Sequence, residues 1–370
     1  MKMKTRILSL LLAGMMTATI ITGCGDSGSS TASTGTADSP KSTEAQSSSA
    51  AQTSPAADGE NEVTGLTLYG VIDPQISAQQ IIADKKGYFA EEGLKVTNKL
   101  IQSGGDISPL ISGKTAKVSF ESTYTDIALA ANKVGVKVVA TVADIGNTQC
   151  VVARKGVEIK SAKDLEGKKI GIASGAGVLI AIRNMCKELG VDIDKIKFVI
   201  LSPSDQIAAF EKGDIDAMAC WEPWVSNAVK LGGTLLFSGL KAYLPEKSGD
   251  VNWLSFYTTM QVTDDFLKEN PNTVASLIKA IKKATDFISE KPDEAAEIIA
   301  AELHLETAQV KEIMGKNKYT MEYNQAFVDA SVSMADFMKE MGNIPEAPSI
   351  DKYADSSILK KVFPELVTAN

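Results

Sequence analysis

Short runs of β-branched and aromatic residues alternate with amphipathic helical segments through most of this chain, and no other sequence feature restricts its fold as strongly. The helical segment 178–189 places Val178, Ile182 and Met185 on a single face. Alternation of this kind predicts an α/β protein with largely parallel sheets. The runs with strand character are residues 66–69, 95–102, 118–120, 136–142, 150–153, 169–173 and 198–200, and a further helix is predicted over 79–89.

The last third of the chain is predicted to be mostly helical, between residues 270 and 341. Asn270 and Pro271 make a suitable cap and first turn for the first of these helices, and Pro292 starts another. An apolar stripe on the first helix predicts that it packs against the core. The stripe consists of Val274, Leu277, Ile278, Ile281 and Ile288.

Residues 1–23 have the composition of a secretory signal. Basic side chains precede an apolar run over residues 7–21, and small residues precede Cys24. The run is shorter than the roughly 20 residues that a membrane span needs. The position of Cys24 resembles the bacterial lipobox, which implies that Cys24 is acylated and becomes the mature N-terminus. An ordinary cleaved signal with an incidental cysteine is the alternative.

Residues 24–62 are rich in Ser, Thr, Ala and Gly and have almost no large apolar side chain. Such a segment buries too little surface to offset the entropy of ordering it, so we predict a flexible tether behind the lipidated cysteine. The remainder of the chain is long enough for two lobes.

The charge and the cysteines exclude several classes of function. The chain has 46 acidic against 38 basic residues and a formal net charge of −8, which argues against a nucleic-acid partner. Cys150, Cys186 and Cys220 have no CxxC spacing, so we expect buried thiols rather than a disulfide framework or a zinc site. We expect no metal and no cofactor.

Two segments of the chain follow the same pattern. Residues 100–122 and 199–221 each read as a strand, a polar cap, a short helix that ends at a glycine, a second strand and a polar or aromatic loop. This repetition predicts two lobes of related topology. Because ligands of open α/β sheets bind beyond the carboxyl ends of strands, we expect a cleft between two such sets of loops.

Several motifs resemble those of one family, the nitrate, sulfonate, taurine and thiamine-precursor binding proteins. Residues 83–96 (ADKKGYFAEEGLKV) look like the first helix and turn of that family, and residues 220–224 (CWEPW) look like its W-x-P element. The segments 102–106 (QSGGD), 161–171 (SAKDLEGKKIG) and 213–217 (GDIDA) match the same pattern. The resemblance extends from about residue 67 to about residue 302.

The resemblance implies an α/β type II periplasmic-binding-protein fold, with two lobes of mixed β-sheets flanked by helices and a ligand cleft between them. Residues 63–149 and 256–370 would form lobe I, and residues 150–255 would form lobe II. The family implies a monomer that delivers a small molecule to the permease and ATPase of an ABC importer. Together with Cys24, it places the protein on the outer face of the bacterial cell membrane, or on the periplasmic side where there are two membranes.

Two loops of lobe I are predicted to reach the ligand. The loop after the first strand carries Asp73 and Gln75, although Asp73 next to a proline also suits a turn cap. The second loop, residues 121–126, contains Ser122, Thr123 and Tyr124, whose hydroxyls and backbone N–H groups suit a polar group at a helix N-terminus. Plain N-capping is the alternative for these hydroxyls.

Lobe II offers a small-residue turn and a cluster of aromatic residues. Ser174, Gly175 and Ala176 lie between a strand and a helix, where small residues let a ligand approach the backbone. The turn lacks the lysine of a Walker loop, which excludes nucleotide hydrolysis. The aromatic candidates carry one carboxylate among them, and one tryptophan of the first pair is expected to be structural. These candidates are Trp221, Glu222, Trp224 and, near the return to lobe I, Trp253.

We therefore predict a non-enzymatic binding protein for a small organic solute, sulfonate-, taurine- or nitrate-like or similar to a thiamine pyrimidine precursor. Few Arg and Lys residues lie in the predicted loops, which counts against a buried anion held by salt bridges. Two alternatives remain: a receptor that presents its ligand to a sensor, and a pyrimidine-synthase-like enzyme. The single His304 lies far from the predicted loops, which disfavours an enzyme.

Overall fold

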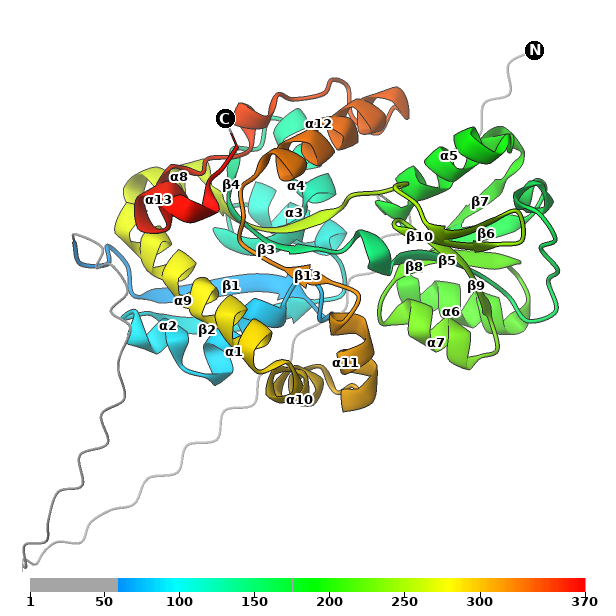
Figure 1. Ribbon diagram of the computed structural model, residues 1–370. Helices are drawn as coiled ribbons and strands as arrows, with labels where there is room; N and C mark the ends of the chain where they lie inside the picture. Colours follow the sequence, from blue (N-terminus) through cyan, green and yellow to red (C-terminus); the bar gives the residue numbers. More distant parts are fainter. Residues whose placement is uncertain (1–58, 175, 370) are drawn as a thin grey trace, which may run out of the picture. The chain divides into compact units, whose positions relative to one another are not determined.

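The computed structural model describes residues 59–174 and 176–369, which form two β-sheets with helices around each (Figure 1). In these residues the first sheet has the strand order β13-β4-β12-β3-β1-β2. β1 is parallel to β2 and β3, whereas β12 is antiparallel to β3 and β4. The strands are β1 (Gly65–Val71), β2 (Lys95–Ile101), β3 (Val118–Ser122), β4 (Val136–Asp144), β12 (Tyr257–Thr263) and β13 (Lys318–Tyr319).

The second sheet has the order β11-β10-β9-β5-β8-β6-β7. Here β6 is parallel to β7 and β8, whereas β5 is antiparallel to β8 and β9. Its strands are β5 (Gln149–Ala153), β6 (Lys169–Ile172), β7 (Lys197–Ile200), β8 (Ala217–Trp221), β9 (Thr234–Ser238), β10 (Lys241–Leu244) and β11 (Lys247–Asp250).

Both sheets are therefore mixed, as the family resemblance implies, and the expectation of largely parallel sheets is wrong. The parallel part of each sheet comes from strand–helix–strand units, which the alternation indicates correctly. The antiparallel part arises because β12 and β5 follow the two passages of the chain between the sheets and enter next to strands of opposite direction.

Helices of the first sheet pack on its two faces. α1 contacts α9 and α10, while α4 contacts α12 and β12. The predicted stripe of α9 is fully buried, with Val274, Leu277, Ile278 and Ile281 at 0 % exposure, and each such side chain stabilises the fold by roughly 1.5–3 kcal/mol. The helices are α1 (Ala78–Lys85), α2 (Tyr88–Glu91), α3 (Gly104–Ser112), α4 (Thr123–Ala131), α8 (Asp264–Glu269), α9 (Pro271–Glu290), α10 (Pro292–Leu303), α11 (Thr307–Met314), α12 (Gln325–Glu340) and α13 (Ser357–Val362).

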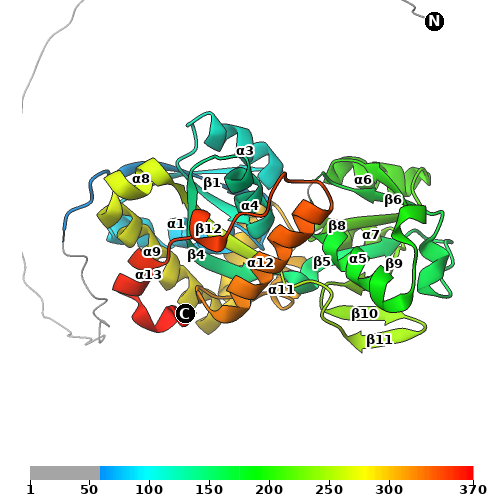
Figure 2. The same ribbon diagram turned by 90° about the horizontal axis from the view of Figure 1, so that it is seen from above.

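Three helices lie around the second sheet: α5 (Val178–Leu189), α6 (Pro203–Lys212) and α7 (Trp224–Lys230), as Figure 2 shows from above. α5 has the predicted bounds because Gly190 takes the left-handed conformation (φ 69°) that ends the helix. Short 3-10 turns cover Gly146–Thr148, Ala162–Leu165, Ile193–Lys195, Ile350–Lys352 and Pro364–Leu366.

The chain passes between the sheets twice, between β4 and β5 and between β11 and β12. The first sheet takes its strands from residues 65–144 and 257–319, and the second from residues 149–250. The units β2–α3–β3 and β7–α6–β8 have the same topology, since β1 lies between β2 and β3 and β6 lies between β7 and β8. They are the two segments whose sequences follow the same pattern. Within residues 59–174 and 176–369, we find no helix with the length and apolarity of a membrane span.

Candidate functional site

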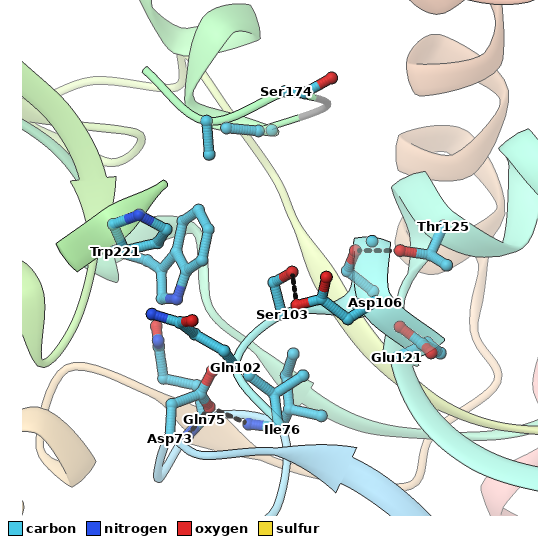
Figure 3. Close-up of a pocket in the computed structure, with 18 of the residues that line it drawn as sticks. Asp73, Gln75, Ile76, Gln102, Ser103, Asp106, Glu121, Thr125, Ser174 and Trp221 are labelled. Atoms are coloured by element: carbon cyan, nitrogen blue, oxygen red, sulfur yellow. Dashed lines mark hydrogen bonds between the residues drawn. The ribbon is translucent and has the colours of Figure 1, made fainter. Parts of the chain in front are cut away.

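The carboxyl ends of corresponding strands in the two sheets face one cavity of about 400 Å³ (Figure 3). The first sheet contributes the residues that follow or end β1, β2 and β3, and the second sheet those that follow or end β6, β7 and β8. Ile145 and Phe256, from the two passages of the chain, also line it. Parallel strands thus bring loops that are far apart in the sequence to one site, where ligands of α/β sheets bind.

Asp73 both caps the turn after β1 and lines the cavity. Its Oδ1 accepts hydrogen bonds of 2.8 Å from the backbone N–H groups of Gln75 and Ile76, which holds the turn. Its Oδ2 has no partner among the described residues. Burial raises the pKa of Asp73 to about 7, against the opposing effect of the two N–H groups.

The Gln75 side chain lines the cavity and connects the two lobes. Its Nε2 donates to the carbonyl oxygen of Glu222 at 2.9 Å, and its Oε1 accepts from the Thr148 hydroxyl. Because both ends of the amide are engaged, Gln75 holds the loop after β8 against the loop after β1.

Glu121, near the end of β3, lines the cavity with an exposure of 0 %. Neither carboxylate oxygen makes a hydrogen bond among the described residues. Burial raises the pKa of Glu121 well above its usual value, and the nearby Asp126 carboxylate adds to the rise, while the Thr125 hydroxyl opposes it. Sequence reasoning did not select Glu121, although a glutamate that directly continues the buried run of residues 118–120 was a usable signal.

The loop after β2 supplies further polar groups that were quoted only as part of a motif. The Ser103 hydroxyl donates to Asp106 Oδ2 at 2.8 Å, at the N-terminus of α3. Gln102 Nε2 donates to Ser204 Oγ at 3.2 Å, a second contact between the lobes. Gln102, Ser103 and Asp106 all line the cavity, and Figure 3 shows them between Trp221 and Glu121.

The predicted loop 121–126 is instead a direct strand-to-helix junction. Ser122 is the N-cap of α4 and lines the cavity, but Thr123 donates to the Tyr257 carbonyl at 2.8 Å and does not line it. The Tyr124 hydroxyl accepts from Asn343 Nδ2 at 2.6 Å and borders a neighbouring hollow. The loop is absent because α4 begins one turn earlier than its apolar residues indicate.

The lobe II turn lines the cavity with Ser174 and Ala176; Gly175 lies outside the described residues. At Gly177 the backbone approaches the Phe256 ring so closely that a Cβ atom would lie 2.8 Å from it, so this position requires glycine. Trp221, the last residue of β8, lines the cavity opposite Glu121 (Figure 3).

Glu222 and Trp224 lie outside the cavity lining. Glu222 is fully buried, and its carboxylate accepts from the Ser226 backbone at 2.9 Å and from Lys316 Nζ at 3.0 Å. Trp224 is the first residue of α7 and packs on an apolar cluster that includes Phe210. Glu222 thus connects lobe II to the segment after α11.

Trp253 belongs to the core of the second lobe. It is 2 % exposed, meets the Phe237 ring edge-on at 5.3 Å and donates from Nε1 to Glu188 at 2.7 Å. Phe256, three residues later, lines the cavity instead.

The three predicted cysteine thiols are free and buried, and no group of three or more His, Cys, Asp or Glu side chains in the described part of the chain is arranged to hold a metal ion. The carboxylates in the cavity lining are Asp73, Asp106 and Glu121, and the described lining residues include no Lys, Arg or His.

This arrangement agrees with comparisons at the level of sequence. The model of the family described as "NMT1/THI5 like" matches residues 76–295, which is more than half of the chain. The chain belongs to this family. A Bacillus subtilis (strain 168) protein named for binding aliphatic sulfonates is 26% identical over 294 residues, covering 77% of this chain and 85% of its own. The taurine-binding periplasmic protein of Escherichia coli (strain K12) is 24% identical, covering 71% and 83%.

Solved structures show the same fold. The periplasmic aliphatic sulphonate binding protein of Escherichia coli superposes with a TM-score of 0.67 at 15% identity, over 80% of this chain and 92% of its own. Not every relative is named as a binding protein. A 4-amino-5-hydroxymethyl-2-methylpyrimidine phosphate synthase of Aspergillus parasiticus is 25% identical over 243 residues, covering 63% of this chain and 67% of its own.

Proposed function

We propose that this protein is an extracytoplasmic solute receptor that captures a small organic molecule and delivers it to an ABC importer. The observation that carries the proposal is the cavity built from strand-end loops of both sheets. A site that draws on two lobes changes when they move, so ligand binding and lobe closure are coupled. A permease could then distinguish the loaded from the empty protein.

The ligand residues that we propose are those at the cavity. Asp73, Gln75, Ser122, Ser174, Ala176 and Trp221 come from the sequence prediction and line it, and Gly175 stays with them as a prediction. Glu121 joins this set. We leave out Thr123, Tyr124, Glu222, Trp224 and Trp253 because their side chains serve packing, hydrogen bonds or an ion pair elsewhere.

The membrane anchor belongs to the same proposal. Cys24 and the surrounding residues 1–58 lie outside the described residues, so the lipid anchor rests on the sequence pattern alone. A signal over residues 1–23 and a tether over 24–62 would hold the lobes 63–149 with 256–370 and 150–255 near a permease, each protein molecule acting as a monomer. Metabolic labelling with a fatty acid, lost in Cys24→Ala, tests the anchor.

The test of capture is ligand identification. The protein purified from its own cells is denatured, and the released small molecules are identified by mass spectrometry. We expect one solute at near-stoichiometric amount, and its return should raise the melting temperature. Trp221→Ala should abolish the rise while leaving the fold intact. A folded protein that releases nothing and is stabilised by no cell-extract fraction would contradict the proposal.

The Aspergillus relative favours a second candidate, a pyrimidine-synthesising enzyme. The described lining residues include neither His nor Cys, the usual side chains for proton transfer and nucleophilic attack. Capture therefore stays the stronger proposal. Product formation on incubation of the protein with cell extract, lost in Glu121→Gln, would favour the enzyme.

A further inference from the structure

The cavity has a one-sided charge pattern. Asp73, Asp106 and Glu121 contribute carboxyl groups from three different loops, and no described lining residue carries a cationic side chain. Asp106 is already engaged by the Ser103 hydroxyl, so Asp73 and Glu121 are the acids with free oxygens. A ligand that enters this cavity meets negative charge without compensation from the protein.

The free oxygens are unusual because they are buried. Glu121 is 0 % exposed and Asp73 is 1 % exposed, and both oxygens of Glu121 and Oδ2 of Asp73 lack hydrogen-bond partners in the described structure. Most buried polar atoms in folded proteins have a partner, because an unmade hydrogen bond leaves the desolvation cost uncompensated. Three unpartnered acceptor atoms on one cavity therefore indicate donors that come from elsewhere.

We propose, on the basis of the solute-capture function above, that the ligand carries a planar nitrogen cation, an amidinium or guanidinium group, that pairs with Glu121. Such a group donates two parallel N–H bonds that match the two oxygens of a carboxylate. A third N–H bond is available to Asp73 Oδ2. The aromatic faces of Trp221 and Phe256, which line the same cavity, suit a flat cation or its attached ring.

The same geometry disfavours a sulfonate or another anion. The oxygens of an anion would lie near carboxyl groups with no cation to separate them, and the buried acceptors would stay unpaired. A site rejects a ligand that leaves its buried polar groups without partners more strongly than it rejects a change of size. This chain therefore differs in ligand charge from the relatives that are named for binding sulfonates and taurine.

Three probes of one size separate charge from shape: benzamidine, benzamide and benzenesulfonate. Each is titrated into the purified full chain by calorimetry. We expect benzamidine to bind at least about tenfold more tightly than benzamide, as a charge-assisted bidentate pair exceeds a neutral one, and benzenesulfonate to bind most weakly. Glu121→Gln should bring benzamidine and benzamide within about twofold of each other. Asp73→Asn should reduce the benzamidine preference less.

The control variant is Glu306→Gln, which removes a carboxylate that is exposed and outside the cavity lining, and it should leave all three affinities unchanged. Circular dichroism and the melting temperature verify that each variant is folded. Benzenesulfonate binding more tightly than benzamidine, or an anion as the solute released from the native protein, would overturn the cation assignment while supporting capture. Absence of any solute from native protein and extract alike would instead defeat the capture function itself.

Discussion

Two buried glutamates stand near the ends of corresponding strands, and they have opposite surroundings. Glu222 follows β8 and is fully paired, with Lys316 at 3.0 Å and the Ser226 N–H at 2.9 Å. Glu121 lies in β3, at the matching place in the other lobe, and neither of its oxygens has a partner among the described residues. Both have 0 % exposure. The difference teaches that one acid holds the lobes together and the other awaits a ligand.

The largest expected effect comes from removing the partner of Glu222. Lys316→Met leaves a buried carboxylate without a cation, and we expect a loss of about 3 kcal/mol in the free energy of unfolding, measured with urea. Lys318→Met is the matched control because its ion pair with Glu322 is exposed and should contribute less than about 1 kcal/mol. Equal losses in the two variants would show that the Glu222 pair has no special role.

The second effect is a fall in stability with rising pH, and it comes from the unpaired acids. Burial raises the pKa of Asp126 from 3.8 to about 8 and that of Asp73 from 3.8 to about 7, and the pKa of Glu121 rises in the same direction. Asp126 faces Glu121 and the hydroxyls of Thr259 and Tyr353; Asp73 faces Tyr319.

In the folded protein these acids keep their protons at a pH where the unfolded chain has lost them. Their contribution to stability is therefore complete below about pH 4 and is lost as the pH rises towards about 8. We expect the free energy of unfolding to fall by about 2 kcal/mol over this window, with Asp126→Asn flattening the curve. Urea unfolding at each pH tests this, and a stability that rises across the window would be the contradicting result.

The third effect is a gain. Glu121→Gln replaces a buried acid without a partner by a neutral side chain of the same shape, so we expect about 1 kcal/mol more stability at pH 8 and almost none at pH 4. Glu222→Gln, the matched change in the other lobe, should destabilise instead because it removes the partner of Lys316. Thermal melting of both variants at both pH values measures the contrast, and a change of the same sign in both would remove it.

The same pair of residues shows how far the sequence predicts this site. The repeated pattern of strand, helix and glycine correctly indicated which strand ends come together, because it depends on local periodicity. It did not separate the two acids. Glu222 attracted attention because two tryptophans flank it, yet its partner Lys316 is 94 residues away in the chain.

Long-range pairing also explains the other differences. The partner of Trp253, Glu188, lies 65 residues earlier, and the edge-on contact with Phe237 comes from the neighbouring β9. Glu121 was overlooked because a strand acid usually faces solvent, and only the packing of α3 and α4 over this edge buries it. Periodicity thus predicted the elements and their ends, whereas the partners of individual polar groups depend on tertiary contacts.

The smallest effect separates the two tryptophans that flank Glu222. Trp221 lines the cavity and Trp224 packs on the apolar cluster under α7, so Trp221→Phe should weaken binding of the native solute about fivefold, whereas Trp224→Phe should leave it unchanged. Trp224→Phe should instead lower the stability of the protein by less than about 1.5 kcal/mol, as a partly filled apolar site does. Titration calorimetry and urea unfolding of both variants provide the two readouts. If Trp224→Phe weakened binding as much as Trp221→Phe, the loop after β8 would act on the ligand as one unit, and the separation between the paired and the unpaired lobe end would lose its aromatic half.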